Sequence, residues 1–148
     1  MTETPPEAPV QTLEMAAAEV LDNLPFPAGA ADPRHTFAAV RVGPDLNDLV
    51  AQHGAVVHVR RVGGIQRTWQ VTARLALTIY AAGYTDAWAA QDAVDARIGG
   101  PWQPNTTRGD GRIRIDSWRN ESAAAEQPYP GLSVLSSIWR VTTRHMPA

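Results

Sequence analysis

One stretch of the chain, residues 55–81, alternates apolar and polar side chains over most of its length. In its second half the odd positions are all apolar: Trp69, Val71, Ala73, Leu75, Leu77, Ile79 and Ala81. A period of two is typical of a half-buried β-strand, because successive side chains point to opposite faces. The first half repeats the pattern at Val57 and Val59 until Gly63 and Gly64 break the run. The stretch therefore predicts a long central hairpin with a glycine-containing turn.

After Ala81 the apolar period changes to about 3.6 residues, which predicts a helix. Thr85 provides the N-cap, and glycines and a proline at 99–101 end the segment. The apolar stripe consists of Ala87, Ala90, Val94 and Ile98. We expect this helix to pack on the odd face of the hairpin, because both surfaces need cover. A second helix is predicted after an N-cap at Thr12, and Pro25 and Pro27 end it.

The remaining elements are shorter in this interpretation. Phe37–Val42 predicts a strand, and Asp45 is placed to cap a single helical turn. Residues 112–117 alternate as a further strand, and a polar loop runs from 121 to 131. The last strand has apolar residues on both faces, so it is either central in its sheet or covered by another subunit. The fold class that follows is α+β, with a mostly antiparallel sheet built around the central hairpin and two main helices packed on one face.

Length and composition favour a single domain. The chain has 148 residues and no cysteine, which excludes thiolate catalysis and zinc–thiolate sites within it. We predict a disordered, proline-rich lead over residues 1–11, one α+β domain over residues 12–148, and a loop at residues 25–35. The lead is acidic where a secretory signal is basic, and no apolar run reaches membrane-spanning length. We therefore expect a soluble, cytoplasmic protein.

Charge is distributed unevenly along the chain. Residues 1–50 carry eight acidic residues against two arginines, whereas residues 51–148 carry seven against eleven, and lysine is absent. Arginine forms planar, bidentate contacts that suit protein interfaces. The two parts either attract each other within one chain or form complementary surfaces of neighbouring subunits.

The sequence contains few patterns that indicate a catalytic, metal-binding or nucleotide-binding site. Its four histidines, His35, His53, His58 and His145, lack the helical i, i+4 spacing that gathers metal ligands. No phosphate-binding glycine loop, dinucleotide fingerprint or nucleophile elbow occurs. Asp110 and Asp116 are paired carboxylates, but Asp110 sits in a Gly-Asp-Gly turn that favours a structural role. We predict no catalytic residue, no cofactor and no metal site. Arginines on polar strand positions suggest nucleic-acid binding, but few aromatic residues accompany them, which favours solvated strand faces or subunit contacts.

Six runs follow one another along the chain: VHVRRVGG, LTIYA, TDAWAAQDAVDARI, RIRIDSW, a PYP loop and the closing SIWRVTTR. In this order they resemble the tail terminator proteins of long-tailed bacteriophages. The resemblance covers Pro44 to Arg144, and its most specific parts are residues 59–64 and the closing strand. None of these runs is a catalytic signature.

The resemblance implies a non-enzymatic virion protein that forms a homo-hexameric ring on the end of the tail tube. The ring stops tube polymerisation and docks to the head–tail connector or stopper protein, and the genome passes its lumen without sequence-specific binding. The expected location is the host cytoplasm during assembly and then the tail–neck junction of the virion. The candidates for subunit interface or lumen are Arg60, Arg61, Gly63, Gly64, Arg74, Arg112, Arg114, Arg140 and Arg144.

Two alternatives remain open from the sequence. One is a neck or head-closure protein of the same particle. The other is a small α+β enzyme or ligand-binding domain that uses His58 and nearby acids, which a deep polar pocket with shifted pKa values would support. The even face of the hairpin, with His58, Arg60, Gln70, Thr72 and Arg74, has no predicted cover within the chain. We expect a neighbouring subunit or the lumen there.

Overall fold

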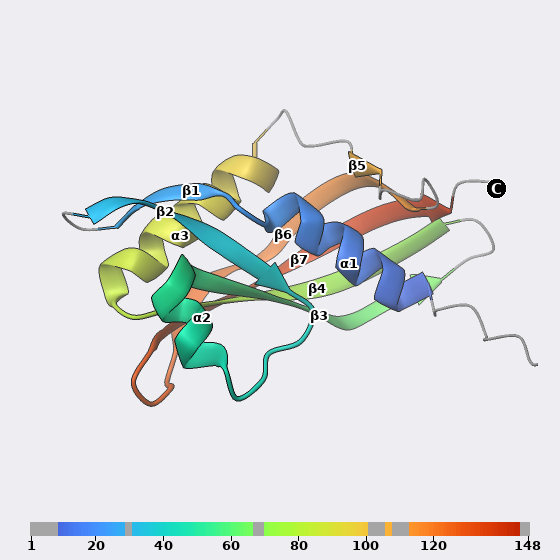
Figure 1. Cartoon of the computed structure of the whole chain (residues 1–148). Helices are drawn as coiled ribbons and strands as arrows, with labels where there is room; N and C mark the ends of the chain where they lie inside the picture. Colours follow the sequence, from blue (N-terminus) through green and yellow to red (C-terminus); the bar gives the residue numbers. More distant parts are fainter. Residues whose placement is uncertain (1–8, 29–30, 67–69, 101–105, 108–112, 146–148) are drawn as a thin grey trace, which may run out of the picture.

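The computed structural model describes residues 9–28, 31–66, 70–100, 106–107 and 113–145. In these ranges a single sheet with strand order β1-β2-β3-β4-β7-β6-β5 curls around two helices (Figure 1). Every strand pair is antiparallel except β2 with β3, which is parallel. The predicted α+β class with a mostly antiparallel sheet is confirmed.

The elements follow one another along the chain without long connections. They are α1 (Pro9–Leu21), β1 (Pro25–Ala28), β2 (Ala31–Ala39), α2 (Leu46–His53), β3 (Gly54–Gln66), β4 (Gln70–Ala81), α3 (Tyr84–Ile98), β5 (Thr106–Thr107), β6 (Ile113–Gln127) and β7 (Ser133–His145).

The central hairpin is formed by β3 and β4, as predicted. The pairing runs from Ala55 opposite Ala81 to Gln66 opposite Val71. The odd side chains of β4 that the structure describes are fully buried: Ala73, Leu75, Leu77, Ile79 and Ala81. The predicted turn at Gly63 and Gly64 is wrong, because both glycines lie within β3, beside a bulge between Arg61 and Gly63. Trp69 lies outside the described residues.

The main core lies between this buried sheet face and the two long helices. The predicted stripe of α3 is buried, and α1 contributes Leu13, Ala17 and Leu21 to the same cluster. Apolar residues of α1, α3, β3, β4 and β7 thus share one core, which confirms that the two main helices pack on one face. α1 begins at Pro9, three residues before the predicted cap at Thr12. Proline is favoured in the first turn of a helix, where its missing N–H leaves no bond unmade.

α2 packs on the opposite sheet face, which corrects the expectation that this face has no cover. Its Leu46 and Val50 form a small second cluster with Val56 of β3. Tyr80 and Leu132 pack against this cluster. The helix has eight residues rather than the single predicted turn, and Asp45 stands at its N-cap without a side-chain hydrogen bond. Only one end of the even face is covered in this way, since Arg60 and Arg74 stay exposed.

Two predicted loops prove to be strands. Residues 25–28 form the edge strand β1, and β2 extends from 31 to 39 rather than beginning at Phe37. Prolines are tolerated in β1 because it lies at the edge of the sheet, where a missing N–H leaves no ladder bond unpaired, and Phe26 anchors it in the core. The second predicted loop, residues 121–131, is mostly part of β6, which extends as far as Gln127. β7 lies between β4 and β6, so the strand with two apolar faces is central.

Candidate functional site

The sheet face opposite α1 and α3 is uncovered beyond α2, and we call this part the open face. Cross-strand pairs place its side chains in rows: Thr72 opposite Thr142, Arg74 opposite Arg140, and Ala76 opposite Ile138. The residues of the open face are Arg60, Thr72, Arg74, Ala76, Ser117, Arg119, Glu121, Ile138, Arg140 and Thr142. Alternation along β4 and β7 produces this polar face directly, because their other face is buried in the core.

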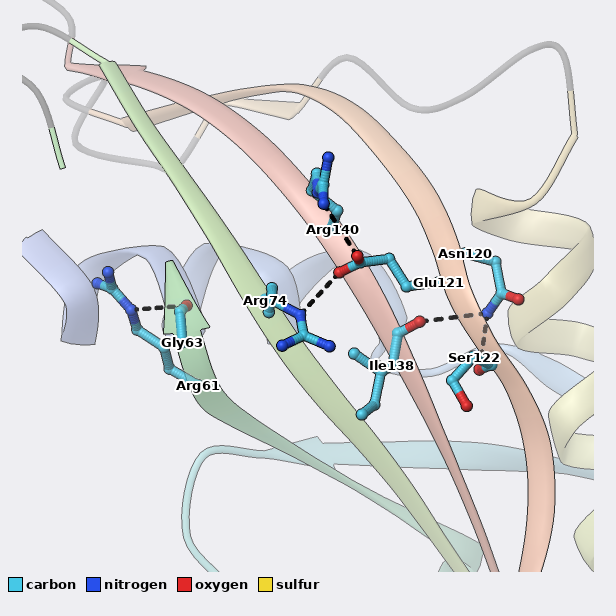
Figure 2. Close-up of polar contacts among 8 residues, drawn as sticks. All are labelled: Arg61, Gly63, Arg74, Asn120, Glu121, Ser122, Ile138 and Arg140. Carbon is cyan, nitrogen blue, oxygen red and sulfur yellow. Dashed lines mark hydrogen bonds and ion pairs between the residues drawn. The ribbon is translucent and has the colours of Figure 1, made fainter. Parts of the chain in front are cut away.

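Glu121 of β6 lies between two arginines that come from different strands (Figure 2). Its Oε1 accepts a hydrogen bond from Nε of Arg74 at 2.9 Å, and its Oε2 accepts one from Nη2 of Arg140 at 3.0 Å. The arginine side chains are 48% exposed, whereas the Glu121 side chain is 22% exposed. The carboxylate therefore holds both guanidinium groups in place while half of each remains available to a partner.

The electrostatics of this trio follow from its geometry. Arg74 and Arg140 are direct cross-strand neighbours, and like charges in that position repel. Partial desolvation acts to raise the pKa of Glu121, but the hydrogen bond from Arg74 and the charge of Arg140 outweigh it, so the pKa lies below its ordinary value. Glu121 stays ionised at neutral pH and offsets the repulsion.

A bulge in β6 brings Glu121 to this position. The register of β6 against β7 shifts between Asn120 and Ser122. The Asn120 side-chain amide donates to the carbonyl oxygens of Ser122 at 3.1 Å and Ile138 at 3.4 Å, which ties the bulge to both strands (Figure 2). Bulges commonly re-aim a side chain in this manner. No alternating pattern marks this part of the chain, which is why residues 121–131 are predicted as a polar loop.

A depression of about 470 Å³ lies beside the ion-pair trio. It is lined by Thr72, Ser117, Trp118, Arg119, Arg140 and Thr142. Two guanidinium groups and three hydroxyl groups are hydrogen-bond donors, and no carboxylate is among the lining residues. Such a surface accepts a carboxylate or another oxyanion. Arg119 was absent from the candidates, although its alternation with the buried Trp118 is a signal that could have identified it.

Arg60 and Arg61 point to opposite sides of the sheet, so Arg61 is not part of the open face. Arg61 is opposite Leu75, whose side chain belongs to the core, and it lies beside Glu14 of α1. Burial raises the pKa of Glu14, and the charge and backbone N–H of Arg61 partly oppose this shift. Nε of Arg61 donates to the Gly63 carbonyl at 3.3 Å, while Nη1 is buried without a hydrogen-bond partner in the described structure. Arg61 is thus placed under α1.

The remaining candidates have these positions. A Cβ on Gly63 would lie 3.8 Å from Cδ of Arg74, so space alone does not demand glycine there. Gly64 is paired with Ala73. Arg114 and Arg144 are directly opposite each other on β6 and β7, in the row that also contains Gln70. Arg112 lies outside the described residues.

The groups around His58 on β3 determine its protonation. Burial lowers its pKa, the Val40 carbonyl raises it through a hydrogen bond, and Arg60 lowers it further, so no carboxylate is among the causes. Within the described ranges, no three histidine, aspartate or glutamate side chains are close enough together to hold a metal ion. None of the helices in this part of the chain has the length and apolar character to cross a membrane.

A second hollow, of about 260 Å³, lies where α3 begins. Tyr84, Trp88 and Tyr129 are among its lining residues. Tyr84 and Tyr129 are also exposed, and Tyr129 makes an edge-to-face contact with Tyr80 at 5.5 Å between ring centres. The carboxylate of Glu126 also belongs to this largely aromatic lining.

Comparison with known proteins does not identify a family for this chain. Neither a scan against protein-family models nor a search of curated proteins finds a match to the chain.

Proposed function

We propose that the chain is a structural virion protein, a tail terminator whose copies form a ring on the end of a phage tail tube. The ring ends tube polymerisation and presents a docking surface to the head–tail connector. The observation that carries the proposal is the open face, where Glu121 fixes Arg74 and Arg140 and leaves half of each exposed. Ordered arginines on a rigid sheet are suited to binding another protein.

The site chemistry favours assembly over catalysis. Hydroxyl and guanidinium groups bind anions, whereas general acid–base catalysis needs a group that exchanges a proton near neutral pH. The described open face offers guanidinium groups and hydroxyl groups as hydrogen-bond donors. Its Glu121 carboxylate is ionised. In this proposal the protein is not an enzyme and needs no cofactor.

The arginines of the open face fit a subunit interface better than the wall of a lumen. A passage for nucleic acid has to release it, and clustered arginines bind phosphates strongly through release of counterions. Carboxylates on a neighbouring protein are the natural partners of these guanidinium groups. We therefore assign Arg60, Arg74, Arg119 and Arg140 to a contact between proteins.

Native mass spectrometry of the full chain tests the ring, and negative-stain microscopy shows its shape. The expected result is a closed oligomer, with six copies as the value that the resemblance implies, and a ring that stops the growth of tail tubes when it is added to tube protein. A chain that is monomeric at every concentration and leaves tube growth unchanged would overturn the proposal. Binding to the connector but not to tube ends would identify a neck or head-closure protein instead.

A further inference from the structure

The described helices carry the opposite charge to the open face. Side chains of α1, α3 and the residue after α1 supply carboxylates at Glu14, Glu19, Asp22, Asp86, Asp92 and Asp95, against a single guanidinium at Arg97. The open face supplies guanidinium groups at Arg60, Arg74, Arg119 and Arg140, with Glu121 among them. The sheet separates these two sets of charges, since α1 and α3 pack on its other face. Apart from Arg61 beside α1, and Asp45 and Asp48 at α2 over one end of the opposite sheet face, a single molecule therefore has an acidic side and a basic side.

The acidic side contains a groove that fits an arginine. Its volume is about 310 Å³, and it is lined by Met15, Ala18, Glu19, Asp22, Ala38, Ala39 and Val40. The groove is apolar apart from its two carboxylates, so it can receive both the methylene stem and the charged end of the side chain. Asp22 is held in place because its Oδ1 accepts a hydrogen bond from the Ala38 backbone N–H at 2.9 Å. Glu19 is exposed.

We propose that the open face of one copy docks on this acidic groove of the next copy, with Arg119 and Arg140 directed toward Glu19 and Asp22. The inference rests on the proposed function, because it specifies how the ring closes. The groove and the open face lie on opposite sides of the sheet, since Ala38 and Val40 pack against the cluster that α1 and α3 share. The two surfaces of one molecule cannot meet, so the contact is head-to-tail, the type that generates a ring when the rotation between successive copies closes.

The chemistry of the two surfaces favours a second copy over nucleic acid as the occupant. The residues that define the open face include no aromatic side chain on which bases could stack. In contrast, the same chain carries a groove with the complementary charge. Complementary patches of this kind specify the partner and its orientation.

A charge-swap experiment tests the contact with two variants of the full chain, Arg119→Glu and Glu19→Arg. Neither side chain makes an ion pair or hydrogen bond that the described structure records, and both are exposed, so both variants should fold. Each alone should weaken self-association at least about tenfold in sedimentation experiments, because one like-charge contact is introduced per interface. Mixed in equal amounts they should reassemble into rings of alternating copies, since every interface then pairs opposite charges.

The controls are Arg97→Glu on α3 and Glu126→Arg at the end of β6, which make the same charge changes away from the contact. Both should leave self-association within about twofold of the parent. The neutral Arg119→Gln should fall between the parent and Arg119→Glu, provided that circular dichroism shows the parent fold.

The outcomes separate this inference from the proposed function. If both single variants form the same rings as the parent, the proposed docking mode is wrong. It is also wrong if the parent forms rings and the mixture of variants does not. In both cases the proposed ring itself is not contradicted. A parent that is monomeric under all conditions would contradict both the docking mode and the proposed ring. If a labelled single-stranded DNA binds the parent, and Arg119→Glu abolishes that binding without affecting the ring, the open face is a nucleic-acid surface and the inference is overturned.

Discussion

Glu121 is the residue on which the order of the open face depends. It bonds Arg74 and Arg140 at the same time, and without it these neighbours would meet as like charges across two strands. Its pKa is lower in the folded chain than in the unfolded chain, where glutamate titrates near about 4.3. The stability that ionised Glu121 contributes is thus fully present above the unfolded-state pKa. It is lost as the pH falls through the lower pKa of the folded state.

Replacing Glu121 by glutamine should lower the stability of the fold at pH 7, and the difference from the parent should shrink as pH falls below the unfolded value. Urea unfolding of both proteins, followed from neutral pH to about pH 3, measures this. Glu126→Gln is the control, because that residue is exposed at the end of β6. A difference that remains constant down to the lowest pH would show that the ion pairs are not its source.

Gly54 is a position where the backbone requires glycine. It ends α2 and begins β3 with φ of 108°, and an added Cβ would lie 2.7 Å from Cδ of Arg34. We expect Gly54→Ala to lower the free energy of unfolding by about 1–3 kcal/mol, measured by urea titration, because an unfavourable backbone conformation and a clash are combined. Gly100→Ala should change it by less than about 0.5 kcal/mol, since nothing lies within 4 Å of an added Cβ there. Equal losses would contradict the strain argument.

Among the elements, those with a regular apolar period were predictable. β4, α3 and β7 each bury one face of a long repeat, so position along the sequence indicates burial directly. β1 was missed because its two prolines indicate a loop, whereas pairing with β2 and burial of Phe26 hold it in the sheet. The second half of β6 was missed because most of its side chains are exposed and bulges interrupt its register, which removes the alternation.

The same bulges explain how far the candidate site could be predicted. Arg74 and Arg140 lie on uninterrupted parts of β4 and β7, and alternation alone assigned them to the polar face. Arg61 precedes the bulge of β3, and the alternation that starts at Val57 and Val59 itself places it on the core side. Glu121, in contrast, reaches the open face through the bulge in β6. A shift of one residue moves every following side chain to the other face, so sequence periodicity fails wherever a bulge occurs.

The buried stripe of α3 should be essential for the stability of the whole sheet. Ile98 is fully buried in the main cluster, whereas its neighbour Arg97 is exposed. Ile98→Ala should lower the free energy of unfolding by about 2–5 kcal/mol, because it leaves a cavity that the core cannot fill. Arg97→Ala should change it by less than about 0.5 kcal/mol in the same thermal or urea titration. A similar loss in both variants would mean that α3 contributes by something other than packing.

At the scale of the molecule, one core connects both main helices with one face of the sheet. Trp118 and Trp139 lie in it, on β6 and β7, together with residues of α1, α3, β3 and β4. We expect the described domain to unfold in one cooperative step, because none of these elements has a separate core large enough to persist alone. Tryptophan fluorescence and far-ultraviolet circular dichroism should therefore report the same midpoint in urea, and two separated midpoints would contradict a single cooperative unit.

Charge is organised by layers in the folded molecule and not by halves of the chain. The sequence places most of the excess acid before residue 51, and the carboxylates of α1 agree with that division. α3 belongs to the arginine-rich part of the chain, yet its Asp86, Asp92 and Asp95 lie on the helical side with those of α1. Only the topology, which brings α1 and α3 to one face of the sheet, reveals an acidic side and a basic side.

Salt dependence distinguishes this arrangement from association through apolar surface. Raising the salt concentration from about 0.1 M to 1 M shortens the screening length from about 10 Å to 3 Å, which weakens exposed charge contacts. Self-association of the parent should therefore fall steeply with NaCl in sedimentation experiments, and it should fall less for the double variant Arg119→Gln with Glu19→Gln. The exposed Tyr84 and Tyr129 offer the competing mode, since contacts built on them would persist or strengthen in high salt. Association that is unchanged by salt, and lost on Tyr84→Ala, would place the subunit contact at that aromatic hollow instead of the open face.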